Sequence, residues 1–287
     1  MPVKTLINGQ SDQFINVLDR GFQYGDGLFE TILIEDGCAT FLSQHLDRLE
    51  RGCERLGFPA LDTAVISAEI SQLIDAERFG VLKLVISRGQ GERGFLAPAE
   101  PTISRVISFS AQASHLSHEL LMLPLIYCQT RLSRQPLLAG LKHLNQLERV
   151  LARNELRAKK LCEGLMLDVD GNVIEGVMSN IFLVKDKALI SPCLSHSGVS
   201  GIIRDFLIEQ AQQAGIRCDI RPVCLEDLEA ADEIFMTNSL MPVRGINTVI
   251  SPTHNLTKNG CELTEWALNC VLDDIQRQIK QTLHGLI

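Results

Sequence analysis

The order in which strand-like and helix-like segments follow one another constrains the fold of this chain more than any other feature of its sequence. Short runs rich in β-branched and aromatic residues, closed by Gly or Asp-Gly turns, recur along the 287 residues. Amphipathic helical segments are interspersed among them, but the two types do not alternate strictly, as they would in a doubly wound parallel sheet. The sequence therefore predicts a mixed α+β fold.

Apolar spacing predicts the individual elements. Leu46, Leu49 and Cys53 recur at helical spacing after Ser43, which is suited to cap a helix. The predicted helices are residues 43–56, 64–76, 145–160, 201–214, 225–230 and 260–283. The predicted strands are residues 4–8, 16–18, 28–34, 39–42, 81–87, 103–110, 121–128, 164–169, 172–175, 180–184, 188–191, 220–223 and 233–237.

One stretch, residues 111–120, lacks periodicity and is the predicted linker between two domains. A small N-terminal α+β domain is expected at residues 1–115, and a larger C-terminal mixed α/β domain at residues 116–287.

Charge and cysteine usage narrow the class of protein. The formal net charge of −8, with no basic stripe to offset it, disfavours nucleic acid and anionic membrane surfaces as partners. The nine cysteines are scattered without a C-x-x-C pair, which favours small core residues in a reducing compartment over disulfides or a zinc site. Neither a signal-peptide pattern nor an apolar run near the roughly 20 residues of a membrane helix is visible. We therefore expect a soluble, cytoplasmic protein.

A glycine-rich loop follows one of the predicted strands. Residues 89–94 match G-x-G-x-x-G, but a dinucleotide site requires a helix to begin at these glycines. Pro98 and Pro101 follow so closely that such a helix is disfavoured. We interpret the loop as a flexible, positively charged lip in which Arg88 and Arg93 meet a carboxylate. On spacing alone, a solvent-exposed glycine turn with incidental arginines explains the loop equally well.

Lys142 lies in an apolar stretch, residues 137–145, where an isolated cation is costly. Desolvation lowers the pKa of a lysine and so favours the neutral amine that Schiff-base chemistry needs. The alternative is a lysine that extends from an amphipathic segment to solvent, and local sequence alone favours this alternative.

Two segments offer groups that suit an anionic cofactor. Residues 198–203 precede a predicted helix, whose N-terminal amides are available to a phosphate. Residues 237–239 follow a strand and add hydroxyl and amide groups, while Glu175 ends another strand, where a carboxylate can hydrogen-bond a ring nitrogen. Taken singly, each of these features is better explained by a capping or turn role. The chain has no histidine pair at metal-binding helical spacing and no G-x-S-x-G elbow.

Short motifs follow one another in order along nearly the whole chain. They are residues 19–30, 45–49, 142–145, the segment around Glu175, and residues 180–182, 201–204 and 237–239. This set resembles the fold-type IV pyridoxal-phosphate enzymes, the group that holds the branched-chain and D-amino-acid aminotransferases and the 4-amino-4-deoxychorismate lyases.

The resemblance implies a pyridoxal 5'-phosphate cofactor, held as a Schiff base on the catalytic Lys142, with Glu175 paired to the pyridine nitrogen. It also implies a set of phosphate ligands. These are Arg48, Ile202, Ile203, Asn238 and Ser239. The family fold has a small N-terminal α+β domain and a larger C-terminal cofactor-binding domain, usually in a homodimer.

Within the family, the loop at residues 87–95, the Lys-His-Leu-Asn segment at 142–145 and the short loop at 237–243 resemble the lyase branch. The lyase converts 4-amino-4-deoxychorismate to 4-aminobenzoate and pyruvate, a step of folate biosynthesis, by proton abstraction and elimination. Against it, Glu30 follows Phe29 as in the aminotransferases.

For the predicted lyase, Arg93, Arg88 and Phe29 are the expected substrate-binding residues. A branched-chain or D-amino-acid aminotransferase on the same scaffold remains the alternative, although Phe95 replaces the carboxylate-binding histidine of the D-amino-acid enzymes. A third hypothesis, a cofactor-free binding or structural protein that keeps only the fold, is disfavoured by the retained lysine, glutamate and arginine.

Overall fold

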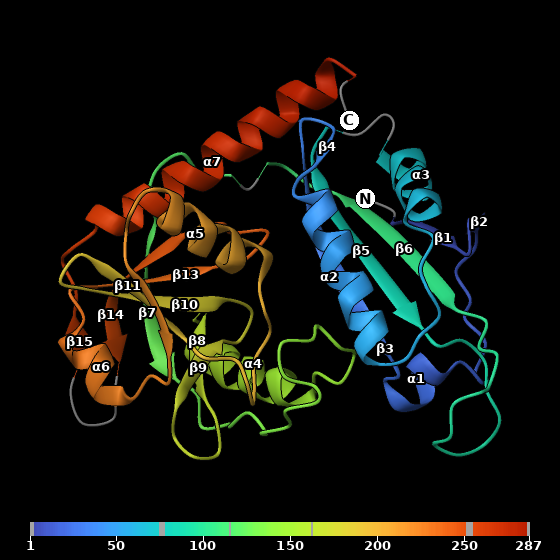
Figure 1. Ribbon diagram of the computed structural model, residues 1–287, viewed down its shortest axis with the longest axis horizontal. Coiled ribbons are helices and arrows are strands. Elements are labelled where there is room, and N and C mark those ends of the chain that lie inside the picture. The colour runs from blue at the N-terminus through green and yellow to red at the C-terminus, as the bar shows by residue number, and fades with distance from the viewer. Residues whose placement is uncertain (1–2, 75–77, 115, 162, 251–254, 286–287) are drawn as a thin grey trace. The chain divides into compact units, whose positions relative to one another are not determined.

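The structure of the chain, a computed structural model, describes residues 3–74, 78–114, 116–161, 163–250 and 255–285. It divides into two compact units, and most of their elements are labelled in Figure 1. Unit 1 comprises Met1–His115, Lys142–Asn145 and Ile275–Ile287, and unit 2 comprises Leu116–Leu141 and Gln146–Asp274. The unit that contains the N-terminal residues thus also includes two later segments.

Unit 1 is built on an antiparallel six-stranded sheet in the order β2-β1-β6-β5-β3-β4. Its strands are β1 Lys4–Ile7, β2 Gln10–Ser11, β3 Gly27–Glu35, β4 Cys38–Ala39, β5 Gly80–Ser87 and β6 Ser104–Ala111. Its helices are α1 Arg20–Tyr24, α2 Leu42–Arg55 and α3 Thr63–Ile74. The predicted stripe of Leu46, Leu49 and Cys53 is buried, so α2 packs against the sheet with its apolar side.

The segment Lys142–Asn145 belongs to unit 1 because it pairs with the beginning of β3. The Phe29 N–H donates to the Lys142 carbonyl at 3.0 Å, and the Leu144 N–H donates to the Gly27 carbonyl at 3.0 Å. A four-residue segment that is far away in the sequence thus lies alongside the first residues of β3. The backbone hydrogen bonds between the two fix the position of the Lys142 backbone.

Unit 2 contains a mixed sheet in the order β12-β11-β10-β13-β14-β7-β8-β9, with β15 paired to β14. Its strands are β7 Met122–Tyr127, β8 Gly164–Leu167, β9 Val173–Gly176, β10 Asn180–Lys185, β11 Ala188–Pro192, β12 Cys218–Arg221, β13 Glu233–Thr237, β14 Arg244–Ile250 and β15 Asn255–Thr257. Its helices are α4 Leu147–Lys159, α5 Ile202–Gln213 and α6 Leu225–Ala230, and the long C-terminal helix α7 spans Glu262–Leu283. In the core of unit 2, the rings of Phe182 on β10 and Phe235 on β13 stack with their centroids 5.0 Å apart.

The predicted α+β class is confirmed, and most elements lie within a few residues of their predicted bounds. The strand predicted at residues 16–18 is wrong, because these residues form a loop and turn with exposed apolar side chains. Helix α1 and strands β2, β14 and β15 were not predicted. The end of the helix predicted at 64–76 lies outside the described residues.

The expectation that the cysteines are core residues is correct only for Cys38, Cys53 and Cys128. The other described cysteines are partly or fully exposed, and Cys162 lies outside the described residues. In the described parts of the chain, no helix is long and apolar enough to cross a bilayer.

Candidate active site

The predicted site residues fall into two groups, one in each unit. Unit 1 holds Lys142, Arg48 and the predicted substrate-binding residues Phe29, Arg88 and Arg93. Unit 2 holds Glu175, Ile202, Ile203, Asn238 and Ser239.

Lys142 directs its amine towards an aromatic ring. Its Nζ lies 4.4 Å from the centre of the Phe29 ring, and both side chains are partly buried. The Phe29 ring is itself placed by β3, whose backbone binds that of Lys142. A lysine fixed by its backbone beside a strand, with its amine on an apolar ring, has the placement that a covalent anchor or a base needs.

Glu30, the residue after Phe29, binds two side chains of α2. The Arg48 Nε donates to Oε1 at 2.8 Å and its Nη2 donates to Oε2, while His45 Nδ1 donates to Oε2 at 2.6 Å. Burial would raise the pKa of Glu30, but the charge of Arg48 and the hydrogen bonds from His45 and Arg48 outweigh burial and lower this pKa to about 2. An ionised Glu30 therefore orients the Arg48 guanidinium.

His45 is fully buried in this cluster. Burial lowers its pKa, the nearby Glu30 opposes the shift, and the positive charges of Arg48 and Lys142 add to it. His45 is thus a neutral donor to Glu30 at pH 7. Its Nε2 has no hydrogen-bond partner among the described residues.

The two arginines of the glycine-rich loop have different environments. The Arg88 guanidinium is buried and donates to Asp26 at 2.9 Å and to the carbonyls of Gly57 and Leu56 at 2.9 and 2.8 Å. Arg93 is exposed, and no side-chain partner is found for it in the described residues. The structure therefore leaves Arg93, rather than Arg88, available to a substrate carboxylate.

Glu175 is almost fully buried in unit 2 and is held on both oxygens. Arg149 of α4 forms an ion pair with Oε1. The Asn180 amide and the Val199 N–H donate to Oε2 at 3.2 and 3.1 Å. These donors hold the carboxylate in a fixed position next to the segment that leads into α5.

The N-terminus of α5 has amides with no side-chain cap. Its first residues, Ile202 and Ile203, are buried, and the N-cap is Gly201, which has no side chain to supply an acceptor. A Cβ at Gly201 would lie 1.9 Å from Asn180 Oδ1, so only glycine permits this approach. The free amides and the helix dipole suit a phosphate.

The turn after β13 lies beside the same asparagine, because Thr237 pairs with Asn180 across β13 and β10. The Thr237 hydroxyl is buried, and no described residue hydrogen-bonds to it. Asn238 uses its side-chain oxygen within the turn, accepting from the N–H groups of Leu240 and Met241 at 2.9 and 2.6 Å. A buried hydroxyl without a partner next to uncapped amides is a fit for a phosphate group.

The groups of each unit, taken by itself, suit a part of pyridoxal 5'-phosphate. Unit 1 has an amine on an aromatic ring and an oriented guanidinium. Unit 2 has a fixed carboxylate, uncapped amides and a buried hydroxyl with no partner among the described residues. Asn180, Arg149 and Thr237 are not among the site residues predicted from the sequence, although Asn180 and Thr237 lie in the motifs. The role of Asn180 is visible only in its contacts: it lies between Glu175, the N-terminus of α5 at Gly201 and the end of β13 at Thr237.

Comparison with protein families gives a match for the class IV amino-transferases over residues 27–249. The chain belongs to this family. An aminodeoxychorismate lyase of Vibrio harveyi is 35% identical over 252 residues, which cover 87% of this chain and 93% of the relative. A provisionally named branched-chain-amino-acid aminotransferase of Methanocaldococcus jannaschii is 32% identical, with coverage of 83% and 84%.

Among solved structures, a 4-amino-4-deoxychorismate lyase of Pseudomonas aeruginosa matches with a TM-score of 0.87 and 41% identity. The match covers 94% of this chain and 99% of that one. These findings confirm the predicted family, its α+β fold and pyridoxal 5'-phosphate as its cofactor. They support the lyase prediction more strongly than the aminotransferase alternative.

Proposed function

We propose that this class IV enzyme is a lyase that converts 4-amino-4-deoxychorismate to 4-aminobenzoate and pyruvate. The observation that carries the proposal is the position of Lys142, fixed beside β3 with its amine on the Phe29 ring, in a chain 41% identical to a solved lyase.

In this proposal Lys142 bonds covalently to the cofactor, and Glu175 holds a proton at the pyridine nitrogen. Arg48, the amides of Ile202 and Ile203, and the turn at Asn238 and Ser239 bind its phosphate. Support comes from the uncapped start of α5 and the unpaired Thr237 hydroxyl beside that turn.

Lys142 is also the proposed base. When bound, pyridoxal phosphate supplies an electron sink for the carbon that bears the substrate amine. Lys142, displaced from the cofactor by the substrate amine, then acts as a neutral amine whose Nζ removes the proton from this carbon. The electron pair left on the carbon forms the new ring double bond as the neighbouring C–O bond breaks, and the enolate that leaves takes up a proton to become pyruvate. The ring becomes aromatic, which makes the step strongly favourable. Lys142 therefore has to be positioned accurately and kept neutral.

We propose that Arg93 binds a substrate carboxylate and that the Phe29 ring contacts the substrate. Arg93 is exposed and has no competing partner among the described residues, whereas the donors of Arg88 serve the fold. An Arg93→Gln variant is expected to raise KM for the substrate by about tenfold or more, the effect of losing one charged hydrogen bond.

The function is tested by measuring pyruvate with purified holoenzyme in the absence of any 2-oxo acid. Pyruvate formation under these conditions supports the lyase, and absolute dependence on a 2-oxo acid supports the aminotransferase. A visible absorbance band that borohydride abolishes, and that Lys142→Ala lacks, identifies Lys142 as the covalent anchor. Lys142→Ala that retains this band would contradict the assignment.

We further propose that the enzyme is a cytoplasmic homodimer. Free thiols at every described cysteine are consistent with a reducing compartment. A cluster of large exposed apolar side chains in unit 1, here called the apolar cluster, supports the dimer. Its members are Phe14, Val17, Leu18 and Phe22. Next to Phe22 lies a cavity of about 760 Å³ over β1, β5 and β6, with Ile7, Val85 and Val106 in its lining.

A further inference from the structure

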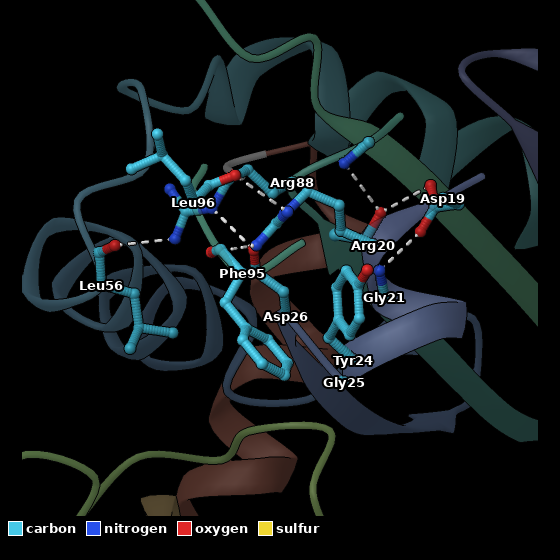
Figure 2. A network of polar contacts seen from close by, with 12 residues as sticks. Asp19, Arg20, Gly21, Tyr24, Gly25, Asp26, Leu56, Arg88, Phe95 and Leu96 are labelled. Carbon is cyan, nitrogen blue, oxygen red and sulfur yellow. Dashed lines mark hydrogen bonds and ion pairs between the residues drawn. The ribbon is translucent and has the colours of Figure 1, made fainter. Parts of the chain in front are cut away.

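Arg20, the first residue of α1, is a buried arginine that the proposed reaction does not use. Its Nη1 donates to the carbonyls of Gly94 and Leu96 at 3.1 and 3.2 Å, and its Nη2 donates to that of Phe95 at 2.9 Å. One guanidinium therefore binds three consecutive carbonyls of the glycine-rich loop, as Figure 2 shows for Phe95 and its neighbours. Only 4% of Arg20 is exposed.

The same short helix binds the loop at further points. The Arg20 N–H donates to the Gly89 carbonyl at 2.8 Å, and the Gly94 N–H donates to the Tyr24 hydroxyl at 3.2 Å. The Tyr24 and Phe95 rings are 5.4 Å apart. The backbone of the loop is thus held at both ends by α1, while Phe95 and Leu96 point their side chains outwards and are 86% and 92% exposed.

Two glycines of the loop permit close approaches, one of them to Arg20. A Cβ at Gly91 would lie 2.9 Å from Arg20 Cδ, and a Cβ at Gly89 would lie 1.8 Å from the Thr102 carbonyl oxygen. Of the three glycines in the G-x-G-x-x-G pattern, Gly91 is the one that leaves room for the Arg20 side chain, while Gly89 permits a close approach to Thr102. The loop that was predicted to be flexible is thus hydrogen-bonded to Arg20 and Tyr24 of α1.

Asp26 connects this contact with the rest of unit 1. Its Oδ2 accepts from Arg20 Nε at 2.8 Å and from Arg88 Nε at 2.9 Å. Burial would raise the pKa of Asp26, but the hydrogen bonds and charges of Arg88 and Arg20 outweigh burial and lower it. The ionised Asp26 therefore fixes Arg20 in the position from which it binds the loop.

We propose that Arg20 is a positioning residue that holds the glycine-rich loop in the conformation in which Arg93 meets the substrate carboxylate. The inference rests on the proposed role of Arg93. Without the Arg20 guanidinium, three loop carbonyls lose their hydrogen-bond donors and bind water instead. The loop then samples conformations in which Arg93 is displaced. Substrate binding then becomes weaker, while proton transfer at Lys142 is unaffected.

Limited trypsin digestion measures how often the loop leaves its bound conformation, because the Arg93–Gly94 bond in the loop is itself a tryptic site. The variant Arg20→Lys keeps a charge next to Asp26 but cannot bind three carbonyls with a planar fork. We expect its holoenzyme to be cut after Arg93 about tenfold faster than the wild type. The matched control is Arg105→Lys, whose partner in unit 1 is Glu69, and it is expected to be cut at the wild-type rate.

Kinetics separate the inference from the proposed function. Arg20→Lys is expected to raise KM about tenfold with kcat within about twofold of the wild type, and to add little to Arg93→Gln. Unchanged cleavage after Arg93 in Arg20→Lys would overturn the positioning role, whatever the kinetics. A second outcome would also overturn the proposal: faster cleavage of Arg20→Lys together with a wild-type KM in Arg93→Gln. It would show that Arg20 holds the loop but that Arg93 does not bind the substrate.

If Arg20→Lys does not fold, Tyr24→Phe provides the test. It removes the acceptor of the Gly94 N–H and leaves the ring in place. A smaller increase in cleavage after Arg93, by about threefold, supports the inference, and a wild-type rate counts against it.

Discussion

At the residue scale, the candidate site depends on charges that the protein buries in pairs. Glu30 keeps Arg48 in place, Arg149 keeps Glu175 in place, and Asp26 does so for Arg20 and Arg88. Arginine suits these sites because its fork binds a carboxylate with fixed geometry and stays charged when buried. Carboxylate–arginine pairs therefore orient Arg48 and Glu175, whereas Lys142 is placed by the pairing of its backbone with β3.

Glu175→Gln tests the electron sink. The amide can keep a hydrogen bond but cannot stabilise a proton on the pyridine nitrogen, so kcat is expected to fall about 100-fold or more. The matched control is Glu163→Gln, a buried carboxylate of unit 2 that accepts from Ser179 and the Val177 N–H. This control is expected to lower stability and leave kcat near that of the wild type. Equal loss of kcat in both variants would indicate a structural effect instead.

His45 and Glu30 make stability depend on pH. Unfolded His45 takes up a proton below about pH 6.5, but burial lowers its pKa in the folded state, so stability falls as the pH decreases through that value. The pKa of Glu30 is lowered from 4.5 to about 2, so its contribution is present above pH 4.5 and is lost as the pH falls towards 2.

His45→Asn keeps an N–H donor near Glu30 but does not titrate. Between pH 7 and 5 we expect its free energy of unfolding in urea to depend less steeply on pH, by about one proton. A wild-type slope in this variant would assign the acid sensitivity to other groups.

At the element scale, the sequence predicts those elements whose side chains pack in a regular pattern. The stripe of Leu46, Leu49 and Cys53 identifies α2, and alternation or apolar runs identify β5 and β10. Helix α1 has only five residues and no apolar stripe, so its sequence does not predict it. The helix is stabilised instead by the Asp19 cap and by the contacts of Arg20. Residues 16–18, which include Val17 and Leu18, were predicted as a strand, but they form a loop and turn in the structure.

The candidate site shows the same limit. Lys142 and Glu175 were predicted because their motifs resemble a known family. The contact of Arg20 with Gly94 joins residues 74 positions apart, and that of Phe41 with Gln278 joins residues 237 positions apart. No local pattern encodes such pairs, so the loop anchor became visible only in the folded chain.

Gly201→Ala tests the N-terminus of α5. The added Cβ would collide with Asn180, which also holds Glu175, so α5 has to shift and its amides move. We expect the Kd for pyridoxal phosphate to rise about tenfold or more, measured by titration of the apoprotein. Gly215→Ala, at the other end of α5, is the control: its Cβ meets no atom within 4 Å, although its φ of +71° strains the variant. It should lose stability but keep cofactor affinity.

At the scale of the whole molecule, the chain combines a net charge of −8 with apolar side chains that unit 1 leaves exposed. Scattered apolar residues are common on protein surfaces, but the apolar cluster gathers within residues 14–22 beside a cavity with apolar lining. A second copy of the chain would remove this surface from water, which supports the proposed homodimer.

The double variant Phe14→Ser/Phe22→Ser tests the dimer. Loss of two buried phenylalanines in each protomer weakens association by about 3 kcal/mol or more, which raises Kd at least about a hundredfold. Sedimentation at micromolar concentration is therefore expected to give the mass of two chains for the wild type and of one chain for the variant. Leu283→Ser, at an exposed leucine outside the apolar cluster, is the matched control and should sediment as the wild type. A double variant that still sediments as two chains would place the interface on another surface, and a wild type that sediments as one chain would contradict the dimer itself.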